Sequence, residues 1–133
     1  MRAFSYQFLQ ESPGDCFTFL RDCFRCVQKA SPTKSHEIPQ RLCDLRLLVR
    51  HYTMNIDGLA SLTNKRTSKE DNQPSVKTVE LHGSLLQLVC RVCGHMVNSS
   101  DVISAEEEIP MKIKENPPRC PHCCKGEMRF RVL

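Results

Sequence analysis

The sequence contains no tryptophan, and its aromatic residues are limited to 2 tyrosines and 6 phenylalanines. Proteins that bind single-stranded nucleic acid interleave aromatic rings, on which bases stack, with basic side chains that hold the backbone. The net charge of +4 is spread along the chain. Its densest basic group, Lys65, Arg66 and Lys69, is followed at once by Glu70 and Asp71. A nucleic-acid partner is therefore weakly supported.

Long apolar runs are also missing from the sequence. No stretch approaches the roughly 18 apolar residues that mark a membrane span. Residues 1–10 carry one basic side chain and lack the apolar centre of a secretory signal. We therefore expect an intracellular protein, nuclear or cytoplasmic, with no membrane association.

Cysteine, by contrast, is abundant, with 9 residues in a chain of 133. An odd number argues against a closed disulfide framework, and in a reducing compartment paired cysteines indicate metal binding. The pairs Cys90-x-x-Cys93 and Cys120-x-x-Cys123 can each place two thiolates on one ion. Four thiolates complete the tetrahedral shell of a structural zinc, so the pairs predict a zinc site without an open coordination position.

Other residues near these pairs leave alternatives open. Cys124 can replace Cys123 as the fourth ligand. His95 and His122 lie close enough in sequence to act as substitutes, but the four thiols are better placed. A third pair, Cys23-x-x-Cys26, falls within an amphipathic helical pattern, so we interpret it as packing rather than as a metal or redox site.

The first half of the chain predicts helices followed by a strand. Apolar residues at helical spacing over 16–27 indicate an amphipathic helix. Ser31 and Pro32 then suit the cap and first position of a second helix, which Pro39 should kink or shorten. The Leu- and Val-rich stretch 45–53 suits a buried strand. With 40% hydrophobic residues, the core should be modest, and zinc can supplement it.

The second half predicts short extended segments around the cysteine pairs. Residues 60–78 are polar and contain a proline, which favours a loop or insertion. Short strands are expected over 79–81 and 85–89, a short acidic helix over 101–109, and a final strand over 126–132. We accordingly divide the chain into a helical segment with a central strand (1–59), the polar loop (60–78), and the remainder (79–133).

Two short motifs carry a family likeness. Residues 53–59 read Thr-Met-Asn-Ile-Asp-Gly-Leu, and residues 81–84 read Leu-His-Gly-Ser. They resemble the Thr-Gln-Asn-Ile-Asp-x-Leu and His-Gly-Ser motifs of the sirtuins, the NAD-dependent protein deacylases. Residues 30–36 and the segments 118–123 and 128–129 are similar to further sirtuin elements in the same order. Each motif is weak alone, but together they are specific.

The resemblance implies an α/β fold: a partial Rossmann-like sirtuin catalytic core with a small four-cysteine zinc-ribbon module. It implies that acyl groups are transferred from lysine on a protein substrate to the ADP-ribose of NAD. By the resemblance, His82 is the family's general base, and a neutral imidazole can accept a proton from a ribose hydroxyl. The expected NAD contacts are Met54, Asn55, Ile56 and Asp57. Asn55 and Asp57 can alternatively form only an Asx-type turn.

The sequence also departs from the sirtuin pattern. Met54 stands where the family has glutamine, which replaces a hydrogen-bonding amide with a thioether. The five glycines are scattered, so no glycine-rich turn is available to hold the pyrophosphate of NAD. We therefore expect an incomplete catalytic domain with little activity by itself. The alternative is a non-enzymatic zinc-binding interaction module derived from a sirtuin.

Overall fold

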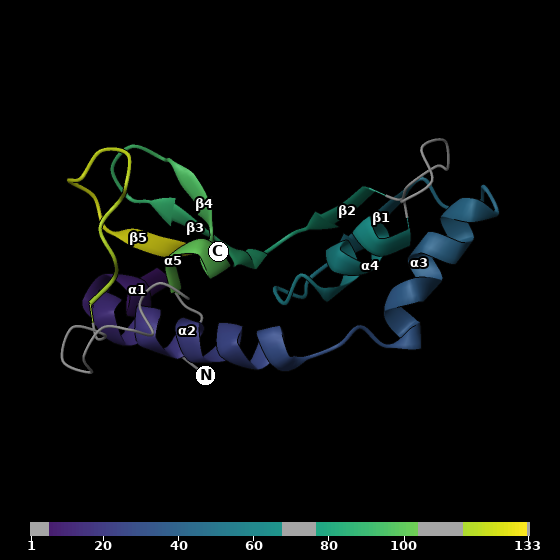
Figure 1. Cartoon of the computed structure of the whole chain (residues 1–133), viewed down its shortest axis with the longest axis horizontal. Helices are drawn as coiled ribbons and strands as arrows, with labels where there is room; N and C mark the ends of the chain where they lie inside the picture. The colour runs from purple at the N-terminus through teal and green to yellow at the C-terminus, as the bar shows by residue number, and fades with distance from the viewer. Residues whose placement is uncertain (1–5, 68–76, 104–115, 133) are drawn as a thin grey trace.

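The computed structural model describes residues 6–67, 77–103 and 116–132. The described elements form two lobes that lie side by side (Figure 1). The first lobe combines an antiparallel sheet with the N-terminal helices. The second holds two helices and a pair of parallel strands. A linker after the second helix and the chain between the two sheets join the lobes.

The first lobe contains α1 (Tyr6–Glu11), α2 (Pro13–Lys29), β3 (Gly83–Cys90), β4 (Met96–Asn98), α5 (Ser99–Ile103) and β5 (Met128–Val132). Its sheet has the order β4-β3-β5, and both pairings are antiparallel. Helix α2 lies across this sheet (Figure 1). In this lobe helices pack on an antiparallel sheet, and the central strand, β3, pairs with both β4 and β5.

Helix α2 confirms the amphipathic pattern predicted over 16–27. It begins with Pro13 at its first position and buries Phe17, Leu20 and Phe24. The rings of Phe17 and Phe24 lie 5.3 and 6.1 Å from that of Phe130 on β5. Leu88 and Met128, at 0% exposure, complete the contact layer. Burying large side chains in this way supplies the main stabilisation of the lobe, typically about 1.5–3 kcal/mol each.

The second lobe contains α3 (Lys34–Asp44), β1 (Arg50–Thr53), α4 (Leu59–Thr67) and β2 (Lys77–Glu80). Strands β1 and β2 pair in parallel, from Arg50 opposite Lys77 to Thr53 opposite Glu80. Helix α3 packs against α4, where Cys43 and Leu59 are buried. This lobe buries fewer large side chains than the first among the described residues.

The start of α3 differs from the prediction. The N-cap is Thr33 rather than Ser31, and the helix begins at Lys34. The backbone N–H of Thr33 donates to Nδ1 of His36 at 3.1 Å, a capping-box arrangement that fixes the boundary. Pro39 stands inside the helix, which continues to Asp44. The proline is tolerated within the helix rather than ending it.

The prediction of a buried strand over 45–53 is largely wrong. Only Arg50–Thr53 form a strand. Leu45, Leu47 and Val49 precede it with exposures of 66%, 73% and 84%. Hydrophobic composition indicated burial, but no element in the described part of the chain covers these side chains.

The predicted polar loop over 60–78 is also corrected. Helix α4 begins at Leu59 and extends to Thr67, and β2 begins at Lys77. Residues 68–76 lie outside the described part. The buried hydroxyl of Thr63 donates to the Leu59 carbonyl at 3.0 Å, so a polar residue fits this helix by bonding to its preceding turn.

The remaining predictions for the second half agree more closely. The stretch 85–89 lies within β3, and β2 covers part of the predicted strand 79–81. Strand β5 occupies most of 126–132, with Met128 and Phe130 buried. Helix α5 covers the start of the predicted helix 101–109, whose residues 104–109 lie outside the described part. No helix among the described residues has the length and apolar character of a membrane span.

Candidate functional site

Four cysteine sulfur atoms meet at one end of the first lobe. The Sγ atoms of Cys90, Cys93, Cys120 and Cys123 all lie within 4.8 Å of one another. Cys90 and Cys123 are 3.7 Å apart at sulfur, and Cys93 and Cys120 are 3.8 Å apart. A tetrahedral ion with Zn–S bonds of about 2.3 Å sets its sulfur atoms about 3.8 Å apart. The cluster therefore fits a structural zinc.

Each cysteine pair sits on a tight turn that presents N–H groups to sulfur. In the first turn, the N–H groups of Val92 and Cys93 donate to Cys90 Sγ at 3.3 and 3.4 Å. Gly94 N–H closes the turn on the Cys90 carbonyl at 3.1 Å. In the second turn, the N–H groups of Gly126 and Lys125 donate to the sulfur of Cys123. Such N–H groups stabilise negative charge on sulfur, as a thiolate ligand requires.

The glycine beside the second turn is required by close packing. A Cβ atom on Gly126 would overlap Cys90 Sγ and lie 3.0 Å from the Val92 side chain. Glycine at this position therefore lets the two cysteine turns approach each other. The sequence placed this residue at the start of a strand but gave no sign of the contact.

The local electrostatics divide the four thiols. The N–H groups of Gly126 and Lys125 lower the pKa of Cys123 to about 6. The His95 N–H lowers the pKa of Cys93, but desolvation and the sulfur atoms of the other three cysteines outweigh it and raise the pKa to about 12. A zinc ion bound among these sulfur atoms would favour the thiolate form of its ligands.

The alternative ligands fall outside the cluster. Cys124 is exposed, at a positive φ of 55°, and its N–H bonds to the Cys120 carbonyl at 3.0 Å. The rings of His95 and His122 stack on each other, with centroids 4.9 Å apart. The cluster as described therefore contains Cys123, not Cys124, and no histidine.

A second polar group forms where the two lobes join. The N–H of Leu81 donates to the Thr53 carbonyl at 2.9 Å, and the N–H of Leu85 donates to the Ile56 carbonyl at 2.8 Å. These bonds extend the alignment of β1 and β2 and hold residues 54–57 alongside residues 82–84. Two motifs far apart in sequence, Asn-Ile-Asp and His-Gly-Ser, are thereby brought together.

Within this group, His82 lies on the turn between β2 and β3 and is exposed. Asn55 is also exposed, and its N–H donates to the Thr53 hydroxyl at 3.1 Å. Met54 is 70% exposed, whereas Ile56 is partly buried against the core of the first lobe. The predicted site residues therefore divide into three exposed side chains and an apolar anchor, with Asp57 beside them.

Asp57 has a structural contact that the sequence allowed as an alternative. Its Oδ1 accepts the N–H of Leu59 at 3.0 Å, at the start of α4. This is an Asx-type turn, and it satisfies one free N–H at the start of the helix. This bond uses only Oδ1, so the other carboxylate oxygen of Asp57 can still accept a hydrogen bond.

Two glycines with positive φ shape the same region. Gly58 has φ of 71°, and a Cβ there would overlap Leu86 on β3. Gly83 has φ of 80°, and a Cβ would overlap the carbonyl oxygen of Arg131 on β5. Both residues allow the Asn-Ile-Asp segment and the His-Gly-Ser turn to lie against the sheet.

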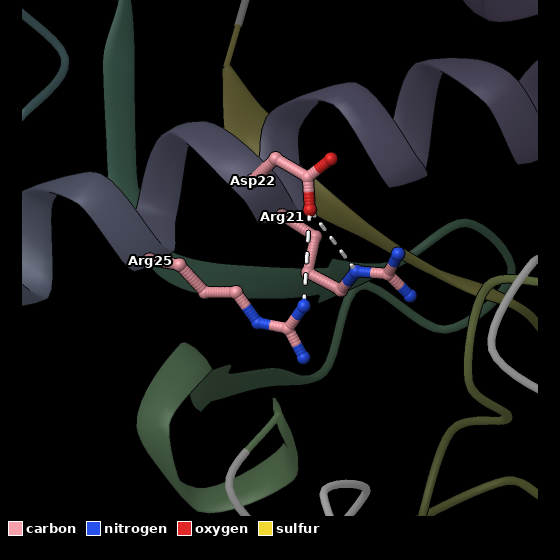
Figure 2. A network of polar contacts seen from close by, with 3 residues as sticks. All are labelled: Arg21, Asp22 and Arg25. Atoms are coloured by element: carbon pink, nitrogen blue, oxygen red, sulfur yellow. Dashed lines mark ion pairs between the residues drawn. The ribbon is translucent and has the colours of Figure 1, made fainter. Parts of the chain in front are cut away.

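A charged group on α2 was not identified from the sequence. Figure 2 shows Asp22 between Arg21 and Arg25, whose nitrogens each lie 3.8 Å from Asp22 Oδ1. The Arg21 side chain is 9% exposed, whereas that of Asp22 is 62% exposed. The signal in the sequence was the opposite charges of Asp22 and Arg25, three residues apart on a helix.

The chain is part of an α/β protein. Its four-cysteine module adjoins the polar site formed by residues 54–57 and 82–84. The family model of the Sir2 family matches residues 1–133. The chain therefore belongs to the Sir2 family, the sirtuins. This confirms the resemblance and the fold class that the motifs implied.

Individual relatives agree with this assignment. The chain is 36% identical over 100 residues to NAD-dependent protein deacetylase hst4 of Emericella nidulans, covering 73% of this chain and 16% of that protein. It is 29% identical over 129 residues to an NAD-dependent protein deacetylase of Caldivirga maquilingensis, covering 97% and 44%. The structure of Sir2Tm bound to a propionylated peptide matches with a TM-score of 0.76 at 23% identity, covering 99% and 48%. The chain thus spans less than half the length of these relatives.

Proposed function

We propose that this chain contributes to NAD-dependent removal of acyl groups from lysine side chains on proteins. The observation that carries the proposal is the pair of backbone bonds that align residues 54–57 with residues 82–84. They bring an amide, a carboxylate and an imidazole together on adjacent segments. Family membership and the names of the relatives, which are protein deacetylases, support this choice of chemistry.

His82 is proposed as the general base. Its side chain is exposed on a turn, so the imidazole is open to a ligand from outside the lobe. The turn is anchored on both sides, by Leu81 N–H to the Thr53 carbonyl and by Gly83 against β5. A base held in this way can accept a proton from a hydroxyl within hydrogen-bond distance.

Met54, Asn55, Ile56 and Asp57 are proposed as the NAD-facing residues. The fit rests on their donors and acceptors: the exposed amide of Asn55 can donate and accept, and Asp57 retains acceptor capacity beyond its bond to Leu59. These groups suit ribose hydroxyls and a carboxamide. Ile56 anchors the segment to the core. When bound, NAD supplies the electrophilic ribose carbon and the nicotinamide leaving group.

The four cysteines are proposed to hold the first lobe together through zinc. A closed shell of four thiolates leaves no position for substrate or water, so the metal has a structural role. Strand β3 runs from Gly83, next to His82, to Cys90 in the cluster. The zinc module therefore supports the strand from which the proposed base emerges.

The proposed substrate is an acylated lysine on a protein. Solved relatives include Sir2 bound to an acetylated peptide and Sir2Tm bound to a propionylated peptide. Because the chain spans less than half of these relatives, we propose that its activity depends on further segments that complete the NAD site. The competing proposal is a zinc-stabilised binding module without catalysis.

The test measures nicotinamide release from NAD in the presence of an acetyl-lysine peptide. The assay uses the full-length polypeptide in which residues 54–57 and 82–84 occur. His82→Ala should reduce the rate by about 100-fold or more, the range of general base catalysis. His122→Ala is the matched control, because it removes an exposed histidine at the cysteine end of the lobe.

Equal rates in the wild type and His82→Ala would contradict the assignment of the base. A folded, zinc-containing protein with no activity in either form would favour the binding module. The result expected from our proposal is loss of activity in His82→Ala alone, with zinc content unchanged in all three proteins.

A further inference from the structure

Two cysteines of α2 stand apart from the zinc cluster. Cys23 is partly buried and packs against the core of the first lobe. Cys26, three residues later, is exposed. The interpretation of this pair as packing therefore holds for Cys23 but not for Cys26.

Their spacing suits a covalent link. Residues three apart on a helix lie on the same face, with Cβ atoms about 5–6 Å apart. A disulfide needs Cα atoms about 4.4–6.8 Å apart and Cβ atoms about 3.5–4.5 Å apart. The Cα requirement is met by helical geometry, and closing the bridge needs only a local tightening of one turn.

The end of α2 already shows such tightening. The N–H of Ala30 donates to the Val27 carbonyl at 3.0 Å, which is a bond across three residues rather than four. In a helix with this bonding, side chains three apart eclipse each other. Extending this bonding by one turn toward the N-terminus would align the Cβ atoms of Cys23 and Cys26, which are three residues apart.

The two thiols also differ in environment. Burial raises the pKa of Cys23, and the neighbouring Cys26 and Asp22 raise it further. Cys26 is the sulfur open to solvent. The exposed thiol is therefore the first to meet a soluble oxidant, and the partly buried thiol is placed to react second.

We propose that Cys23 and Cys26 form a redox-sensitive dithiol, which small-molecule disulfides convert into an intramolecular disulfide. In the first step the Cys26 thiolate attacks the small disulfide, whose S–S bond breaks and releases one thiol. In the second, Cys23 attacks the mixed disulfide at Cys26 sulfur and releases the second thiol. The two cysteines lose two electrons and two protons, and the small disulfide becomes two thiols.

The link bears on the packing of α2. Phe24 lies between the two cysteines in sequence and is 2% exposed against Phe130. A bridge that tightens this turn strains the helix, and strained disulfides are the more readily reduced ones. The pair thus has the properties of a reversible modification site rather than of a permanent structural link.

The chain offers a direct assay because Arg25 separates the two cysteines. Zinc-containing protein is incubated with oxidised glutathione, blocked by alkylation and digested with trypsin. Cleavage after Arg21, Arg25 and Lys29 releases two short peptides, 22–25 and 26–29. We expect these peptides to be recovered joined by a disulfide from protein that runs as a monomer without reductant, and to separate after reduction.

Variants distinguish the steps. Cys26→Ser should abolish the linked pair, and Cys23→Ala should stop the reaction at glutathione-modified Cys26. Cys124→Ser, the matched control at another exposed cysteine, should leave the linked pair unchanged. Wild-type protein in which Cys26 carries glutathione but no linked pair forms would overturn the proposal. Recovery of the pair only from covalent dimers would overturn it as well, because the bridge would then join two chains.

Discussion

At the scale of single residues, two glycines with the same backbone conformation have different surroundings. Gly83 and Gly94 have φ of 80° and 71°. A Cβ on Gly83 would overlap the Arg131 carbonyl oxygen, whereas a Cβ on Gly94 would meet no heavy atom within 4 Å. The positive φ favours glycine at both positions. At position 83, the close approach of β5 favours glycine as well.

Replacing each glycine with alanine separates the two effects. Gly94→Ala should cost about 1 kcal/mol in the free energy of unfolding, from the positive φ alone. Gly83→Ala should cost about 1–3 kcal/mol more, because β5 must move away from β3. Urea denaturation of both variants measures the difference, and equal losses would show that the contact with Arg131 is easily relieved.

A pair of substitutions tests the capping contact of Asp57 apart from its proposed role toward NAD. Its carboxylate caps α4 through Leu59 N–H, and asparagine can make the same bond. Asp57→Ala should therefore lower the free energy of unfolding by about 1 kcal/mol, whereas Asp57→Asn should change it little. Thermal unfolding followed by circular dichroism tests this, and matching losses in the two variants would contradict the capping role.

For the cysteine cluster, the sequence predicted which sulfur atoms come together but not the contacts that hold their turns. The spacing of Cys90, Cys93, Cys120 and Cys123 was sufficient to predict the cluster, because each short turn brings two sulfurs together. The choice between Cys123 and Cys124 was left open, since it depends on a backbone turn with positive φ at Cys124. A local residue pattern does not specify such a turn.

At the scale of elements, α2 was predictable and β1 was not. Helix α2 repeats its apolar residues at helical spacing and packs on a sheet within the described chain. The stretch before β1 is equally apolar, but its burial depends on what lies opposite, and Leu47 and Val49 remain exposed. Helix α4 was missed because its polar composition resembles a loop, although Thr63 is buried and bonded within it.

The packing of α2 gives a prediction at this scale. Phe24→Ala should destabilise the protein by about 3–5 kcal/mol, because a ring at 2% exposure is lost from the contact with Phe130. Phe19→Ala on the same helix should cost less, because Phe19 is 37% exposed. Chemical denaturation provides the comparison. A larger loss for Phe19 would show that the buried face of α2 has been misassigned.

At the scale of the whole molecule, the two lobes are stabilised differently. The first has a packed core and a cysteine cluster, whereas the second has a parallel strand pair flanked by exposed apolar side chains. Parallel sheets are normally covered on both faces. The chain between β2 and β3 links the two lobes, and β3 then runs from Gly83, next to His82, to Cys90 in the cluster.

This arrangement predicts an uneven response to metal removal. Chelation should increase amide hydrogen exchange in β3, β5 and the cysteine turns, since structural zinc contributes folding energy directly. Exchange in α3 and α4 should change much less, because these helices pack on each other away from the cluster. Cys90→Ser should reproduce the effect, whereas Cys43→Ser, which alters a buried cysteine of α3, should leave zinc content unchanged. Uniform loss of protection across both lobes would show that they unfold as one unit. Unchanged protection in β3 would show that zinc does not stabilise the strand next to His82.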